Sequence, residues 1–118
     1  MSIIRSNIMG MVNQAFEKDI IPIIGVSLLC DPEMTAREWA AQTSPSHFHK
    51  INNDLLQLRE WIYEFVKGLD IQVIDFCDGF KKKIKESKDV SQWYLDGLHP
   101  TPKGNRIMAE IFQIDEDI

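Results

Sequence analysis

The stretch Ile20-Ile21-Pro22-Ile23-Ile24-Gly25-Val26 decides the fold class of this chain. It is a continuous apolar run bounded by polar residues, which is typical of a strand that is buried on both faces of a parallel sheet. Pro22 has no N–H to donate to a neighbouring strand, so regular pairing is expected to start late in the run. The sequence therefore predicts a β-strand over residues 20–26.

Helical patterns flank this strand on both sides. Before it, apolar residues recur every three or four positions over residues 3–18. After it, residues 51–68 show the longest pattern of this kind, which Gly68 is expected to end. Asn52 or Asn53 is the expected cap at its start. Two amphipathic helices are therefore predicted, one on each side of the strand in sequence.

Residues 27–50 lack a long hydrophobic period. Pro32, Pro45 and several serines interrupt it, so we expect mostly loop with a short helix over residues 35–41. A loop of this length directly after a strand is often functional. It is therefore a candidate for the wall of a ligand pocket.

The second half of the chain continues the alternation of strand and helix. Residues 71–76 are rich in β-branched side chains and predict a strand, and a charged helix is expected over residues 78–87. Thr101 can cap a last helix that has Pro102 at its first position. The buried stripe of that helix is expected to comprise Ile107, Met108, Ile111 and Phe112. This order predicts parallel strands joined by helical crossovers, which is an α/β fold.

The composition is that of one folded domain. The chain has 118 residues, of which 44% are hydrophobic and 26% charged. Thirteen basic against eighteen acidic residues give a net charge of −5, so the whole molecule has no electrostatic case for binding nucleic acid. The basic run Lys81-Lys82-Lys83 is interleaved with apolar residues at helical spacing, which favours a solvated helix face.

Cysteines and hydropathy point to a cytoplasmic protein by default. Cys30 and Cys77 are too few for a disulfide framework and show no Cys-x-x-Cys spacing. No stretch reaches the roughly 18 consecutive apolar residues of a membrane span. The first residues also lack the apolar core of a signal peptide, although secretion of a longer parent protein is left open.

The chemically most suggestive residues are Asp96 and His99, in the stretch Trp93-Tyr94-Leu95-Asp96-Gly97-Leu98-His99-Pro100. A histidine becomes a general base when a carboxylate holds one ring nitrogen and the other faces a nucleophile. An acid three positions earlier in a tight turn can reach back to the ring. The same spacing also occurs in polar turns that precede helices, so the pattern alone leaves a structural role open.

The wider string Asp96-Gly97-Leu98-His99-Pro100-x-x-x-Gly104 resembles the C-terminal block of the SGNH hydrolases, also called GDSL-type esterases and lipases. The order of the other elements is similar as well. The resemblance implies a flavodoxin-like three-layer α/β/α fold and a Ser-His-Asp triad. In that triad Asp96 would orient the ring of His99, and His99 would be the base.

Other blocks of that family are missing from the sequence. There is no Gly-Asp-Ser nucleophile block, and Asn53-Asp54 lacks the glycine of the family's oxyanion asparagine block and stands after the wrong strand. Gly25-Val26-Ser27 suggests the Gly-x-Ser-x-Gly elbow of α/β-hydrolases, but residue 29 is leucine, so we do not assign Ser27 as a nucleophile. We therefore expect residues 1–118 to form a single partial domain with about the last two strands of the fold.

Further side chains have weaker claims to a role. His47 and His49 would share a face in an extended segment, but no carboxylate stands at supporting spacing, so we expect neither a metal site nor a cofactor. Trp39 and Phe48 are candidates for lining the substrate pocket, with simple cover of the sheet end as the alternative. Cys77 has no catalytic companion and is expected to be an ordinary buried thiol.

The sequence thus predicts the C-terminal part of a serine esterase that acts on a small-molecule ester and is inactive as this chain alone. A base and its orienting acid cannot work without nucleophile and oxyanion donors. The alternative is a non-catalytic module that pairs its exposed strand with another chain, either by self-association or with a missing N-terminal half. A third reading is a small flavodoxin-like binding domain in which Asp96 and His99 form only a structural turn.

Overall fold

The computed structural model describes residues 2–39, 44–84 and 89–113, without the side chains of Trp39 and Val90. The elements follow one another as α1 (Ser2–Glu17), β1 (Ile23–Val26), α2 (Pro32–Trp39), α3 (Pro45–Phe65), β2 (Gln72–Asp75), α4 (Phe76–Ile84), a short 3₁₀ turn η1 (Val90–Gln92) and α5 (Pro102–Ile111).

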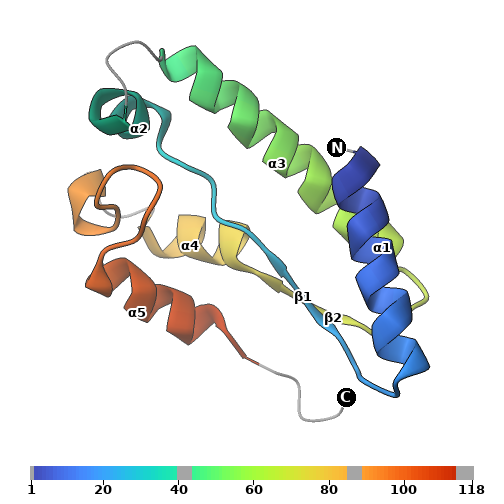
Figure 1. Ribbon diagram of the computed structural model, residues 1–118. Helices are drawn as coiled ribbons and strands as arrows, with labels where there is room; N and C mark the ends of the chain where they lie inside the picture. Colours follow the sequence, from blue (N-terminus) through green and yellow to red (C-terminus); the bar gives the residue numbers. More distant parts are fainter. Residues whose placement is uncertain (1, 40–43, 85–88, 114–118) are drawn as a thin grey trace.

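The two strands form a parallel sheet with helices on both of its faces. β1 pairs with β2 in a register that places Ile24 opposite Val73 and Val26 opposite Asp75. Helices α1 and α3 lie on one side of the strands, and α4 and α5 lie on the other (Figure 1). The chain is therefore an α/β domain, and a sheet of only two described strands is consistent with an incomplete one.

Each side of the sheet has its own hydrophobic core. Under α3, Ile62 packs with Val26 of β1 and Cys77 of α4. On the other side, the ring of Phe80 meets that of Tyr94 edge to face, with 5.6 Å between ring centroids. The buried residues that complete this second core are Met34, Trp93 and Ile107. The second core lies directly beneath the segment that carries Asp96 and His99.

The first strand is shorter than the sequence predicts. It begins at Ile23, and both Ile20 and Ile21 are more than half exposed. Pro22 accounts for the late start, as expected, because it cannot donate a hydrogen bond to a neighbouring strand. Burial on both faces is also wrong for most of the run, since Val26 is the only strand residue here that is buried.

The prediction of a mostly irregular segment over residues 27–50 is wrong. Helix α2 begins at Pro32, and α3 begins at Pro45 instead of near residue 51. Proline is tolerated in the first turn of a helix because the N–H it lacks has no partner there. The prolines that interrupt the hydrophobic period therefore mark helix starts.

The expected cap at Asn52 or Asn53 is also wrong, because both residues lie inside α3. Asn53 is exposed, whereas Asn52 is buried. The Asn52 carboxamide oxygen accepts the N–H of Cys30 at 3.0 Å, and its nitrogen donates to the carbonyl of Cys30 at 2.8 Å. Asn52 therefore fastens the segment after β1 to the helix.

The charged helix after the second strand begins earlier than residue 78. α4 starts at Phe76 without a loop, and the Asp75 carboxylate accepts the N–H of Asp78 at 2.9 Å. This is the bond of an N-cap, so the last residue of β2 also starts the helix. In the final helix Ile107 is buried as expected, but Phe112 lies past the helix end and is about half exposed.

Candidate active site

The segment that carries Asp96 and His99 is a closed loop between two paired positions. An antiparallel bridge joins Tyr94 to Pro100, and the N–H of Leu95 donates to the carbonyl of His99 at 2.8 Å. Tyr94 is buried and its hydroxyl donates to the carbonyl of Leu29 at 2.6 Å. The base of the loop is therefore attached to the chain that leaves β1, at the carboxyl end of the sheet.

Within this loop the Asp96 carboxylate binds His99 at two points. Its Oδ2 lies 2.8 Å from Nδ1 of the His99 ring, and its Oδ1 accepts the N–H groups of His99 at 2.7 Å and Leu98 at 2.9 Å. Desolvation alone would raise the pKa of the Asp96 carboxyl. The hydrogen bonds from the His99 backbone, the His99 ring and the Leu98 backbone outweigh it and hold the pKa well below its usual range.

Gly97 allows the turn between the acid and the histidine. Its φ is +86°, a conformation that L side chains rarely adopt. A β-carbon at this position would lie 2.6 Å from the backbone nitrogen of Thr35 and 2.9 Å from the carbonyl oxygen of Asp31. The Gly97 carbonyl accepts the N–H of Asp31 at 2.8 Å. The loop therefore rests directly on the backbone at the start of α2.

The start of α2 is itself fixed by local hydrogen bonds. The Asp31 carboxylate accepts the N–H of Met34 at 2.9 Å, as a helix cap does. The hydroxyl of Thr35, a residue that is almost fully buried, donates to the Asp31 carbonyl at 2.7 Å. The surface under Gly97 is thus a rigid helix start.

On its other side the loop leads directly into α5. Thr101 caps this helix as predicted, because its hydroxyl oxygen accepts the N–H of Gly104 at 3.0 Å, with Pro102 in the first turn. The same hydroxyl donates to the carbonyl of Gln92 at 2.6 Å. Gly104 is needed for packing, since a β-carbon there would lie 2.5 Å from the carbonyl oxygen of Trp93. Both ends of the loop are therefore constrained.

This arrangement has the geometry of an imidazole oriented by a carboxylate. The Asp96 side chain is 26% exposed and that of His99 is 59% exposed, so the ring reaches solvent. A carboxylate that accepts the Nδ1 proton selects the tautomer whose basic lone pair is on Nε2. The pair can therefore accept a proton from a group that approaches the exposed side of the ring.

Comparison with known protein families assigns the chain. The family model for GDSL-like lipase/acylhydrolase proteins matches residues 2–112. The chain belongs to this family. Membership of this family indicates a hydrolase of the esterase and lipase type. It also implies the SGNH α/β fold, with which the two parallel strands are consistent. No protein of known annotation matched the chain in a search of curated sequences.

A small apolar cavity lies beside the loop of this GDSL-type chain. It has a volume of about 150 Å³ and is lined by Leu29, Cys30, Cys77, Phe80 and Tyr94 among others. Burial raises the pKa values of both thiols, so neither is a ready thiolate nucleophile. Cys77 is thus the buried thiol that the sequence indicates.

Of the two residues predicted to line a substrate pocket, the structure describes the side chain of Phe48 alone. Phe48 is half-buried in the first turns of α3, where its ring meets that of His47 at 5.2 Å between centroids and its carbonyl accepts the thiol of Cys30 at 3.9 Å. Neither contact reaches the Asp96–His99 loop. The side chain of Trp39 lies outside the described residues.

His47 and His49 are exposed in α3. No three His, Cys, Asp or Glu side chains in residues 2–39, 44–84 and 89–113 are placed to hold a metal ion. Ser27 follows β1 and lines the groove between that strand and α3. In the same ranges, no helix combines the length and apolar character of a membrane span.

Sequence reasoning missed the residues that support the loop from below. Asp31 and Thr35 are far from His99 in the sequence, and no local motif predicts that they contact this loop. Tyr94 stands within the quoted stretch, but the residue that its hydroxyl contacts, Leu29, is far away in the sequence. The one available signal is Asp31-Pro32, since an acidic residue before a proline is a helix-start pattern.

Proposed function

We propose that this GDSL-family chain supplies the acid and the base of a Ser-His-Asp triad, as the C-terminal part of a serine ester hydrolase with a flavodoxin-like three-layer fold. One observation carries the proposal, the 2.8 Å contact between Asp96 Oδ2 and His99 Nδ1 in a ring that reaches solvent. Residues 1–118 act in this proposal as a single partial domain that contributes about the last two strands.

In this mechanism His99 takes up and releases a proton in each of two half-reactions. Its Nε2 takes the proton of a serine hydroxyl as the oxygen attacks the ester carbonyl, and the ring becomes an imidazolium. It then returns that proton to the leaving alcohol, which yields an acyl-enzyme. Water then attacks the acyl-enzyme in the same way. His99 takes the proton of the water and returns it to the serine as the carboxylic acid leaves. Asp96 stays ionised throughout, which suits a carboxyl whose hydrogen bonds hold its pKa far below neutrality.

In this proposal the nucleophile and the oxyanion donors come from outside these residues. The sequence has no Gly-Asp-Ser block. Asn53 lies exposed in the middle of α3, and we assign it no role as an oxyanion donor. The chain alone is therefore expected to be inactive towards small-molecule esters, because triad members work as a unit. The chemistry needs no metal and no cofactor.

The test combines two measurements that do not depend on each other. First, nitrogen NMR of the chain alone should show the neutral His99 ring with its proton on Nδ1, and Asp96→Asn should abolish that preference. His47 is exposed and has no such carboxylate contact among the described residues, so it is the internal reference. A neutral ring protonated mainly on Nε2 would contradict the assignment of Nε2 as the base.

Second, the chain is mixed with a polypeptide that carries the Gly-Asp-Ser block and first strands of a GDSL-type hydrolase, and hydrolysis of p-nitrophenyl acetate is followed. We expect turnover in the mixture, none above background from this chain alone, and a loss of about a thousandfold or more with His99→Ala. The control His47→Ala should keep full activity. Clear turnover by the chain alone that disappears with His99→Ala would overturn the partial-domain proposal.

A further inference from the structure

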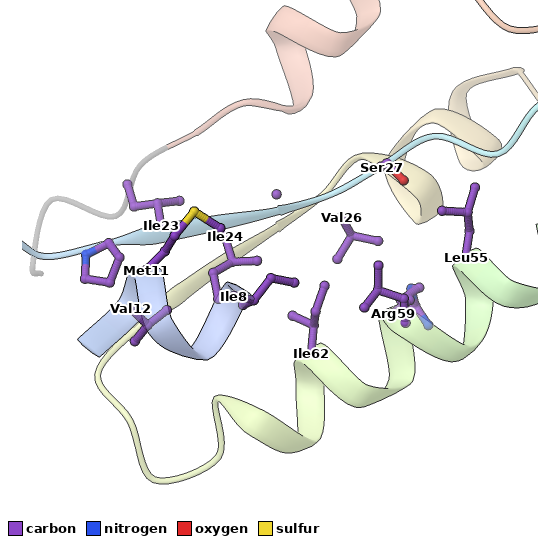
Figure 2. A pocket seen from close by; sticks show the side chains of 13 residues that line it. Ile8, Met11, Val12, Ile23, Ile24, Val26, Ser27, Leu55, Arg59 and Ile62 are labelled. Atoms are coloured by element: carbon purple, nitrogen blue, oxygen red, sulfur yellow. The ribbon is translucent and has the colours of Figure 1, made fainter. Parts of the chain in front are cut away.

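Helix α3 contacts the chain of β1 in two different ways. Along the strand the contact is apolar, since Ile62 of α3 packs against Val26 of β1. Figure 2 shows both side chains directed towards the space between the strand and the helix. Beyond the end of the strand the contact is polar, because Asn52 of α3 binds the backbone of Cys30. Burying a polar amide costs free energy unless it is hydrogen-bonded, so packing alone is a poor reason for an asparagine at this position.

The carboxamide of Asn52 takes the place of a neighbouring strand for one residue. Its oxygen accepts the N–H of Cys30 at 3.0 Å, and its nitrogen donates to the carbonyl of the same residue at 2.8 Å. A residue in a hydrogen-bonded pair of an antiparallel ladder exchanges both of these bonds with its partner. Cys30 is 8% exposed and lies between β1 and α2, where regular secondary structure does not pair its backbone. Asn52 therefore supplies the partner that these two buried groups need.

The two residues next to Cys30 hold the loop that carries the acid and the histidine. The carbonyl of Leu29 accepts the hydroxyl of Tyr94 at 2.6 Å, and the N–H of Asp31 donates to the carbonyl of Gly97 at 2.8 Å. In an extended backbone the polar groups of one residue point to one side, and the carbonyl before it and the N–H after it point to the other. This three-residue segment accordingly lies between α3 and the loop and is bonded to both (Figure 1).

The shape of the loop and its position depend on different contacts. The bond from the Leu95 N–H to the His99 carbonyl lies within the loop, and so do the bonds from His99 to the Asp96 carboxylate. The bonds of Leu29 and Asp31, in contrast, join the loop to the chain that leaves β1. Loss of the second set would let the loop shift as a unit while the acid and the histidine stay paired.

We propose that Asn52 is a positioning residue for the acid–base pair. By holding Cys30 it fixes the residues on either side, Leu29 and Asp31. These two residues in turn fix where the His99 ring stands at the carboxyl end of β1. The catalytic consequence rests on the proposed function, because there the ring has to meet a serine that comes from outside these residues. The position of the loop in the chain alone does not depend on that function.

A role in stability alone is the competing explanation for Asn52. In that case its bonds would only hold α3 against the chain, and their loss would weaken all parts of the fold alike. Two backbone amides distinguish the explanations by hydrogen exchange. The Asp31 N–H reports the attachment of the loop, because it donates to the loop carbonyl of Gly97, and the Leu95 N–H reports the closure of the loop on itself.

The test compares Asn52→Leu with Asn53→Leu in the chain alone. Asn52→Leu roughly keeps the side-chain shape and removes both hydrogen bonds with Cys30, whereas Asn53 is the exposed neighbour in the same helix. Unpaired buried groups at Cys30 should loosen the segment that follows β1. We therefore expect the Asp31 amide to exchange about tenfold faster or more relative to the Leu95 amide in Asn52→Leu, and to be unchanged in Asn53→Leu.

A double-mutant cycle tests the route from α3 to the loop. Tyr94→Phe removes the hydroxyl that binds the Leu29 carbonyl, so it interrupts the same route at the other end. Together with Asn52→Leu it should speed the exchange of the Asp31 amide by less than the product of the two separate effects. Independent effects that simply multiply would show that Asn52 does not act through this segment.

Nitrogen NMR and turnover show what happens to the pair itself. The His99 ring should keep its proton on Nδ1 in Asn52→Leu, because its contact with Asp96 lies within the loop. In the mixture with the polypeptide that carries the Gly-Asp-Ser block, Asn52→Leu should lower kcat for p-nitrophenyl acetate about tenfold or more and leave KM within about twofold, since a misplaced base slows the chemical step. Asn53→Leu should keep the kcat of the parent chain.

The two proposals can fail separately. A mixture with the parent chain that shows no turnover would count against the proposed function, and exchange at Asp31 would still decide the role of Asn52. Equal acceleration of the Asp31 and Leu95 amides, no acceleration at Asp31, or an unchanged kcat in an active mixture would overturn the positioning role. Circular dichroism verifies that Asn52→Leu folds.

A second variant serves if Asn52→Leu does not fold. The ionised side chain of Asn52→Asp can accept the N–H of Cys30 but cannot donate to its carbonyl, so one of the two bonds is lost. The same acceleration of the Asp31 amide relative to the Leu95 amide is expected, and its absence would overturn the positioning role equally.

Discussion

The Asp96–His99 loop and helix α1 differ in how firmly the rest of the chain holds them. The loop is closed by its own backbone bridge, seated on the start of α2 and continued into a capped helix. α1 is longer, but it buries a single side chain. The loop is held in one conformation by many independent contacts, whereas Val12 is the one buried side chain that holds α1.

The carboxyl end of β2 belongs with the firmly held region. Asp75 accepts the guanidinium of Arg59 and the hydroxyl of Tyr63, each at 2.8 Å, besides its bond to the start of α4. Desolvation opposes ionisation of Asp75, but these hydrogen bonds prevail and lower its pKa. Burial and the neighbouring Asp75 raise the pKa of Tyr63 to about 12. Polar contacts are therefore concentrated at the carboxyl ends of both strands.

The contrast between the loop and α1 shows which part of the chain is fixed by its own contacts. Ligand sites of parallel α/β sheets lie at the carboxyl ends of the strands, and this is the end that the chain fixes by itself. The lateral edge is the part that would need another strand for cover. The contact between Asp96 and His99 is thus formed in a chain whose described sheet has only two strands.

The largest expected effect contrasts two phenylalanines. Phe80 is 2% exposed in the core beneath the loop, and Phe16 is 40% exposed on α1. Phe80→Ala should lower the free energy of unfolding by about 3–5 kcal/mol, because it removes buried surface and leaves a cavity. Phe16→Ala should cost less than about 1 kcal/mol. Urea denaturation followed by circular dichroism measures both, and a Phe80→Ala chain that is unfolded without urea also satisfies the expectation.

Equal losses for the two variants would break the comparison. That result would mean that α1 contributes as much to the fold as the core under the loop does.

A smaller effect contrasts two glycines with positive φ. Gly97 has a φ of +86° and a β-carbon there would meet the backbone of α2, whereas Gly68 has a φ of +76° and open space around it. Gly97→Ala should cost about 2–3 kcal/mol of unfolding free energy, and Gly68→Ala about 1 kcal/mol for the left-handed conformation alone. The difference between the two, read from urea midpoints, reports the steric contact with Asp31 and Thr35. Equal costs would show that the loop does not rest on α2.

The fold class could be predicted from the sequence because its signals are local. The apolar run before Ser27, the β-branched run before Phe76 and the cap at Thr101 each fall within a few residues. Hydrophobic periodicity and capping chemistry are sufficient to detect such elements. The pairing of Asp96 with His99 was predictable for the same reason, since the two residues are only three positions apart. Its catalytic role stays a prediction.

Other features could not be predicted because they depend on tertiary contacts. Pro32 and Pro45 can be identified as helix starts only once the helices that follow them are known. Asparagine is a common helix cap, but the hydrogen-bond partner of Asn52 is Cys30, twenty-two positions away in the sequence. The contact of Gly97 with the start of α2 could likewise not be predicted, because the two segments are far apart in the sequence.

The smallest expected effect concerns the pH dependence of the loop. Asp96→Asn removes an ionised acceptor of three hydrogen bonds and should cost about 1 kcal/mol of unfolding free energy at neutral pH. The folded-state pKa of Asp96 lies below its unfolded value of about 3.9. The unfolded chain therefore binds the proton first as pH falls, and the contribution of Asp96, complete above that value, is lost on the way down to the folded pKa.

The stability of the parent chain and of Asp96→Asn should accordingly converge as the pH drops below about 4, when urea midpoints are measured along a pH series. His99→Gln is the informative control. It removes the ring contact but keeps the backbone donors of residues 98 and 99, so most of the convergence between this variant and its Asp96→Asn double mutant should remain. Parallel curves for the parent chain and Asp96→Asn would mean that the carboxylate is no better held in the folded chain than in the unfolded one. The loop would then be no firmer than α1.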